Sequence, residues 1–155
     1  MSNQVRPNEK VCVPFAGVGP FAIPAAARGA EVLAIEKNPE AFRYLIENIA
    51  LNHLTRNCSA LLGDALDTAR LPNTVFDRLI IPAPYGLDNA LETLLPVLSD
   101  NGMVHLYTFR AKEQIPDLIL AFEREGLRVG YSAPCGNVAP GVSRWVFDMA
   151  RTPDL

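Results

Sequence analysis

Continuous apolar runs alternate with amphipathic stretches along most of the chain. Five such runs are typical of strands buried on both faces of a parallel sheet. They lie at residues 11–13, 32–35, 59–62, 78–81 and 103–107. Two further strands are predicted at 127–131 and 145–149, joined by a segment rich in Gly and Pro. No helix is predicted between these two, so we expect them to form an antiparallel hairpin at the sheet edge.

Amphipathic or apolar stretches between the runs predict the helices. The clearest begins after Asn38, a good N-cap, with Pro39 at the first helical position, and continues to about Asn52. Other helices are predicted at 20–28, 88–98 (disturbed at Pro96) and 116–125. The repeated β-α order followed by β-β predicts one α/β domain over residues 1–155. The polar residues 1–9 are expected to form a flexible N-terminus.

Composition narrows the choice of protein class. The chain has 155 residues, of which 49% are hydrophobic and 20% charged, and no apolar run approaches the length of a membrane span. Its three cysteines are widely spaced, so neither a disulfide framework nor a metal site is indicated, and a cytoplasmic location is expected. The net charge of −3 gives no support to a self-sufficient nucleic-acid binder.

The loop after the first predicted strand carries the pattern G-x-G-x-x-A, with Gly17, Gly19 and Ala22. Glycines at these positions let the backbone turn tightly and approach a ligand. Glu36 ends the second strand 19 residues after Gly17, where a carboxylate can accept hydrogen bonds from ribose hydroxyls. This combination predicts a nucleoside ligand. The alternative is a tight strand-to-helix turn that binds nothing, and the pattern does not separate NAD from S-adenosylmethionine.

Three features favour S-adenosylmethionine. Asp64 follows the third strand, where a carboxylate can receive an adenine amino group, although it can also simply cap its own loop. The turn at 82–85 follows the fourth strand, beside the place where the reactive group would be presented. The chain ends in a hairpin, whereas a dinucleotide-binding fold continues with a second nucleotide-binding half.

Several segments together resemble class I methyltransferases, and most of all the archaeal tRNA guanine-37 N1-methyltransferases and the wybutosine-synthesising transferases. The most specific is Pro14 to Phe21, PFAGVGPF, which is similar to the family's first motif. The resemblance extends from Lys10 to Met149. It is carried further by residues 35–39, 47–49, 63–64, 77–78, 102–107 and 138–142.

The resemblance implies a catalytic domain with a Rossmann-like, mostly parallel seven-stranded sheet of order 3-2-1-4-5-7-6 and an antiparallel last strand. It implies S-adenosylmethionine as cofactor and tRNA as a possible partner. The implied cofactor-binding residues are Phe15, Ala16, Gly17, Val18, Gly19, Glu36, Lys37, Asn38, Gly63, Asp64 and Ala65. The implied catalytic residues, on the acceptor side, are Pro82, Pro84 and Tyr85.

The sequence departs from the family pattern in three ways. Val13 stands where the first motif has an acidic residue, and Pro82 stands where the methyltransferases have the Asn that helps to orient the reacting base. The resemblance covers the catalytic domain only. We therefore expect tRNA binding to need a further domain or a partner chain.

Several functions remain open at this stage. The leading hypothesis is a methyltransferase acting on tRNA or another nucleic-acid base. The alternatives are a non-catalytic cofactor-binding module or subunit and a methyltransferase for a small molecule; an NAD-dependent dehydrogenase is disfavoured. Asp88 and Tyr85 are the nearest groups that could take a proton from the acceptor, whereas His53 and His105 are predicted to be structural. The sequence does not distinguish transfer of a methyl group from transfer of an aminocarboxypropyl group.

Overall fold

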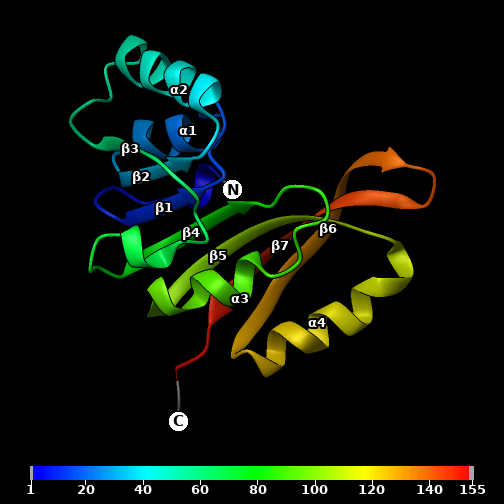
Figure 1. The fold of residues 1–155 in the computed structure, drawn as a ribbon. Coiled ribbons are helices and arrows are strands. Elements are labelled where there is room, and N and C mark those ends of the chain that lie inside the picture. Colours follow the sequence, from blue (N-terminus) through cyan, green and yellow to red (C-terminus); the bar gives the residue numbers. More distant parts are fainter. Residues whose placement is uncertain (1, 154–155) are drawn as a thin grey trace.

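A seven-stranded sheet forms the centre of the molecule in the computed structural model, which describes residues 2–153 (Figure 1). The strand order is β3-β2-β1-β4-β5-β7-β6. Neighbouring strands from β3 to β5 are parallel, and β7 runs antiparallel to both β5 and β6. This confirms the predicted order. The strands are β1 Lys10–Pro14, β2 Glu31–Glu36, β3 Cys58–Leu62, β4 Phe76–Pro82, β5 Leu98–Arg110, β6 Leu127–Ala139 and β7 Val142–Arg151.

Within residues 2–153, four α-helices cover the two faces of this sheet (Figure 1). They are α1 Ala22–Ala27, α2 Pro39–Leu51, α3 Ala90–Leu94 and α4 Ile115–Arg124. On one face α1 and α2 pack on β1 to β3 through buried residues such as Val11, Val13 and Leu45. On the other face α3 and α4 pack on β4, β5 and β7 around Leu79 and Phe147. No helix in the described part of the chain is both long and apolar enough to cross a membrane.

Two helices differ from their predicted bounds. The helix expected at 88–98 is the short α3 followed by a 3-10 turn over Leu95–Val97. Pro96 lies in that turn, and its missing N–H prevents the α-helical bonding pattern from continuing. The helix expected at 20–28 is shortened to α1, which begins at Ala22. Residue 20 still belongs to the loop around Gly19.

The final hairpin is longer than predicted. Nearly all of the segment between 131 and 145, which was expected to be a loop, belongs to β6 and β7, and the turn lies at Pro140 and Gly141, the latter with φ of +76°. Three register shifts in β6 let it stay paired despite its Gly and Pro residues. Because β6 is the edge strand, Pro134 needs no ladder bond on the outer side.

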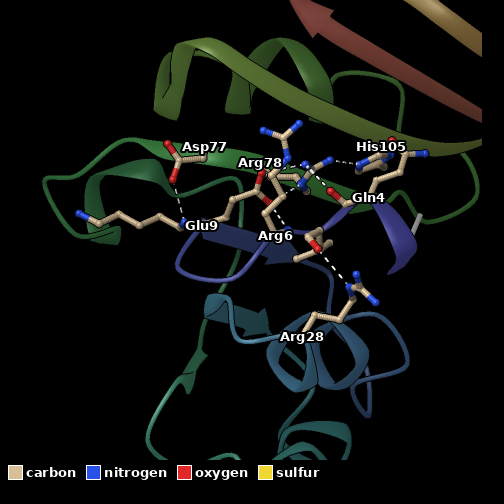
Figure 2. A network of polar contacts seen from close by, with 9 residues as sticks. Gln4, Arg6, Glu9, Arg28, Asp77, Arg78 and His105 are labelled. Atoms are coloured by element: carbon tan, nitrogen blue, oxygen red, sulfur yellow. Dashed lines mark hydrogen bonds and ion pairs between the residues drawn. The ribbon is translucent and has the colours of Figure 1, made fainter.

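The N-terminal segment is joined to the sheet by a buried polar network (Figure 2). The Arg78 guanidinium donates to both carboxylate oxygens of Glu9 at 2.9 Å and to the Gln4 carbonyl at 3.0 Å. Its Nη1 lies 2.6 Å from Nε2 of His105, whose Nδ1 lies 2.7 Å from Asp148. The Gln4 side chain closes the ring by donating to Asp148 at 2.8 Å.

These contacts differ from the flexible segment expected over residues 1–9. Val5 is 1% exposed, and its carbonyl accepts a hydrogen bond from Arg28 at 3.1 Å. The polar sequence of this segment gives no sign of these contacts, because most of the groups that bind it lie on β4 and β7, far away in the sequence. Met1 lies outside the described residues.

Candidate functional site

The loop between β1 and α1 makes a tight turn with three residues at positive φ. Phe15, Gly17 and Gly19 all have positive φ, of +54°, +58° and +103°. A methyl group added at Gly19 would lie 2.9 Å from Cγ1 of Ile23 and 3.0 Å from Cδ1 of Leu45. The glycine is therefore required both by its backbone conformation and by close packing. Gly17 has open space on its Cα instead, so its backbone is accessible to a ligand.

The carboxylate of Glu36 fixes this loop to the end of β2. Its Oε2 accepts a hydrogen bond from the Gly17 N–H at 2.8 Å, and its Oε1 accepts one from the Asn38 N–H at 2.8 Å. Each oxygen keeps a further lone pair for a ligand hydroxyl. Asn38 in turn caps α2, because its Oδ1 accepts from Glu40 N at 2.9 Å and from Ala41 N at 3.2 Å.

A cavity of about 190 Å³ opens beside Glu36, where the carboxyl ends of β1, β2, β3 and β4 meet. Ligands of open α/β sheets bind at this edge. The structure thus brings together five of the eleven predicted cofactor residues and two of the three predicted acceptor residues. It adds Ile35, which the sequence analysis placed in an apolar run and did not assign to the site. The lining consists of Phe15, Ile35, Glu36, Lys37, Gly63, Ala65, Pro82 and Pro84.

Six of the predicted cofactor residues do not line this cavity, namely Ala16, Gly17, Val18, Gly19, Asn38 and Asp64. Ala16 is buried beneath the loop, and its N–H donates to the Ile35 carbonyl at 2.8 Å. Val18 is 46% exposed, and its carbonyl accepts from the Asn48 side chain at 2.8 Å. Asn48 lies in the helical segment 47–49 of the family resemblance, but the sequence did not assign it a role. Gly19 and Asn38 act through the loop and the helix cap described above.

Asp64 adopts the geometry of a loop cap. Its Oδ1 accepts a hydrogen bond from the Leu66 N–H at 3.0 Å, and its side chain is exposed. The preceding Gly63 donates its N–H to the Glu36 carbonyl at 3.0 Å, which ties the ends of β2 and β3 together. The cavity is therefore flanked by Gly63 and Ala65, while the second oxygen of Asp64 has no protein donor in residues 2–153.

The turn after β4 separates into two parts. Pro82 and Pro84 line the cavity, whereas Tyr85 is 67% exposed and packs its ring on Phe109, 5.4 Å between centroids. Asp88, on the same turn, forms an ion pair with Arg110 at 2.8 Å. A second hollow of about 320 Å³ lies against this part of the turn. Tyr85 therefore belongs to the neighbouring surface and not to the cavity wall.

A larger hollow of about 530 Å³ lies at the opposite edge of the sheet, near the amino ends of β1, β2 and β3. Lys10, Glu31 and Arg56 are among the residues that line it. None of the residues predicted for the site lies there. The tethered carboxylate and the glycine loop, and not the size of a hollow, therefore locate the functional site.

Comparisons with known proteins agree on one family. Residues 1–128 match the TRM5/TYW2 methyltransferase domain. The chain is 29% identical over 157 residues to tRNA(Phe) (4-demethylwyosine(37)-C(7)) aminocarboxypropyltransferase of Pyrococcus horikoshii, and the match covers 96% of this chain and 56% of that enzyme. Across the curated relatives, the chain spans 13% to 56% of their length.

Two solved structures from Methanocaldococcus jannaschii have the same fold. One is described as TYW2 in complex with AdoMet; it has a TM-score of 0.80 and 31% identity, and the match covers 96% of this chain and 71% of that one. The other is described as tRNA m1G37 methyltransferase; it has a TM-score of 0.87 and 26% identity, with 99% and 47% covered.

Proposed function

Because the chain belongs to the TRM5/TYW2 methyltransferase domain family, we propose that it is a transferase that uses S-adenosylmethionine and modifies a base of tRNA. The observation that carries the proposal is the position of Glu36. Its carboxylate is held by the Gly17 and Asn38 N–H groups at the edge of the cavity, with lone pairs left for two ribose hydroxyls.

The other cavity residues fit the remainder of that cofactor. Phe15, Ile35 and Ala65 give the cavity an apolar lining on which the flat adenine ring would pack. Asp64 lies next to Ala65 and retains an acceptor oxygen for an adenine amino group. We assign cofactor binding to the eleven residues predicted from the sequence, and we add Ile35. Asn48 holds the loop in shape through the Val18 carbonyl.

On the acceptor side, the chain supplies position and not a strong acid. S-adenosylmethionine carries the electrophilic carbon on its sulfonium, so the protein has mainly to align the acceptor with it. Pro82 and Pro84 form the rim where the acceptor atom would arrive. Asp88 is the nearest carboxylate on this turn, and it forms an ion pair with Arg110.

The choice of tRNA rests on the relatives, which are described as tRNA methyltransferases and tRNA aminocarboxypropyltransferases. Since the chain spans only part of their length, we propose that tRNA is gripped with help from a further domain or a partner chain. Two of the three cysteines, Cys12 and Cys58, are buried free thiols, which fits our placement of the protein in a reducing cytoplasm. We also propose an archaeal source, because the three curated relatives matched over 40% or more of their own length come from archaea, whereas the eukaryotic relatives are matched over 13% to 31% of theirs.

Transfer of the aminocarboxypropyl group is the second candidate reaction. The relative from Pyrococcus horikoshii that matches 96% of this chain is described with that activity. In addition, Pro82 offers neither a side-chain amide nor a backbone N–H for orienting a guanine, which weakens the case for guanine N1 methylation.

Cofactor binding is tested by titration calorimetry with S-adenosylmethionine. We expect Glu36→Ala to weaken binding about 10- to 100-fold, because a charge-assisted hydrogen bond contributes about 1.5–3 kcal/mol. Glu40→Ala is the matched control, since its exposed carboxylate lies at the start of α2, shortly after Glu36 in the chain but outside the cavity. Absence of binding by the unmodified chain at millimolar cofactor would refute the proposal.

The transferred group is identified by two labelled forms of the cofactor, incubated with the chain and total tRNA. Label from the methyl group alone in the tRNA would establish methyl transfer, and label from the carboxyl group alone would establish aminocarboxypropyl transfer. Binding without transfer to tRNA would instead support the non-catalytic module, and label in small molecules alone would support a small-molecule methyltransferase.

A further inference from the structure

Arg144 is a partly buried arginine that forms no ion pair within residues 2–153. Among the lysines and arginines of the described chain, four are buried or half-buried: Arg78, Arg110, Arg144 and Arg151. Arg78 and Arg110 have carboxylate partners, and Arg151 donates to two backbone carbonyls, at 2.6 and 3.1 Å. Arg144 makes no hydrogen bond or ion pair within residues 2–153, and its Nε is buried without an acceptor. An unpaired, partly desolvated guanidinium is costly, which indicates a ligand.

Arg144 lies among aromatic rings at the edge of the sheet that carries the cavity. It is the cross-strand partner of Phe109, near the end of β5, and its guanidinium lies 5.1 Å from the centre of the Tyr107 ring. Tyr107 packs on Phe21, 4.8 Å between centroids, and Phe109 packs on Tyr85. We call these four rings, Phe21, Tyr85, Tyr107 and Phe109, the aromatic shelf.

The aromatic shelf adjoins the cavity directly. Tyr107 is the strand partner of Pro82, which lines the cavity, and the Tyr107 carbonyl accepts a hydrogen bond from Ala83 at 3.0 Å. Phe21 continues the loop that begins at Phe15. The shelf and its guanidinium are therefore placed where an acceptor would extend away from the reacting base. The neighbouring Trp145 has a buried indole N–H without a partner as well, but successive strand residues point to opposite faces.

We propose that Arg144 binds a phosphate of a polynucleotide acceptor, whose bases stack on the aromatic shelf. The inference rests on the proposed function and identifies which surface of this chain the nucleic acid follows. A guanidinium binds phosphate through two parallel hydrogen bonds, and aromatic rings stack on bases without regard to sequence. The exposed Tyr85 and the half-buried Phe109 form one end of this surface, with their ring centroids 5.4 Å apart. The β6–β7 hairpin, which carries Arg144, projects beyond the rest of the sheet (Figure 1).

Binding is measured by fluorescence anisotropy of a labelled single-stranded RNA heptamer on the whole 155-residue chain. We expect Arg144→Gln to raise the Kd about tenfold and to reduce the slope of log K against log salt by about 0.7, the value for one lost phosphate contact on a single strand. Arg144→Lys should recover part of the affinity. Arg128→Gln is the matched control, because Arg128 is an exposed arginine at the far end of the same hairpin.

Equal Kd values for the Arg144→Gln and Arg128→Gln variants would overturn the inference, and so would a wild-type chain that does not bind the heptamer. Guanosine 5′-monophosphate is added as competitor. If it displaces the RNA at equal or lower concentration, the phosphate belongs to a small acceptor and not to a polynucleotide. Calorimetry separates this inference from the proposed function. Arg144→Gln should leave the Kd for S-adenosylmethionine unchanged, whereas absence of cofactor binding by the wild type would count against the function itself.

Discussion

The free energy of unfolding should rise as the pH rises towards about 6.5, the usual pKa of histidine, and we assign the rise to His105. This imidazole is fully buried, and burial lowers its pKa below the usual value. The hydrogen bond to Asp148 opposes that shift, whereas the positive charge of Arg78 adds to it. Since Arg78 can only donate, Nε2 of His105 must accept and Nδ1 must carry the proton. Protonation would place two donors 2.6 Å apart.

The sign follows from proton binding. Below about pH 6.5 the unfolded chain protonates His105 while the folded chain does not, so stability falls as the pH falls, until the folded imidazole is protonated too. One proton limits the slope to about 1.4 kcal/mol per pH unit. The carboxylates in the same network, Glu9 and Asp148, do not account for this window. Burial alone would raise their pKa values, but hydrogen bonds from Arg78 and His105 outweigh it and lower them, so both titrate at more acidic pH.

Urea denaturation at pH 5, 6 and 7 measures this slope. His105→Gln should flatten it, whereas His53→Gln should retain it, because His53 is exposed and is the chain's only other histidine. If the slope is the same in wild type and His105→Gln, the reasoning is wrong. Where the His105→Gln variant does not fold, NMR titration of the His105 ring in the wild type gives the answer, and a midpoint at or above 6.5 would contradict the argument.

Two further substitutions test the loop after β1 and the polar network around Arg78. Gly19→Ala should lower the free energy of unfolding by about 1–3 kcal/mol, because alanine is strained at φ of +103° and its methyl group would meet Ile23. Urea denaturation with and without S-adenosylmethionine measures this loss of stability. A loss below about 0.5 kcal/mol would contradict the loop geometry. Arg78→Met should lower the free energy of unfolding by about 3–5 kcal/mol in the same assay, because it leaves the Glu9 carboxylate unpaired in a site where Arg78 is 3% exposed. Retention of wild-type stability would show that water replaces the arginine.

The core of the fold was predictable because its determinants are local. Each parallel strand is a short apolar run, and α2 is defined by Asn38, Pro39 and its own apolar stripe. The order of the strands came from the family resemblance, not from periodicity. Prediction did worse where pairing depends on a distant partner. The Gly and Pro content of the segment between 131 and 145 predicts a loop. In the structure nearly all of it is paired in the β6–β7 ladder, with three register shifts.

The cofactor site was predicted better than the acceptor site for a similar reason. Phe15, Gly17 and Glu36 lie within 22 consecutive residues and follow one recognisable spacing. Ile35 was missed because a cavity-lining residue at the end of a strand has the same apolar character as a core residue. The role of Asn48 was missed because its acceptor, the Val18 carbonyl, is a backbone group and leaves no trace in the sequence.

The acceptor side draws on segments that are far apart in the chain, and this separation has a functional consequence. Tyr85 follows β4, Phe109 ends β5 and Arg144 begins β7, so this surface exists only after the hairpin has paired with β5. None of these three residues lines the cofactor cavity. Substitutions on β7 can therefore change which acceptor is held without changing the affinity for S-adenosylmethionine. A family that keeps one cofactor loop and varies this hairpin can thus change its acceptor while its cofactor site stays the same.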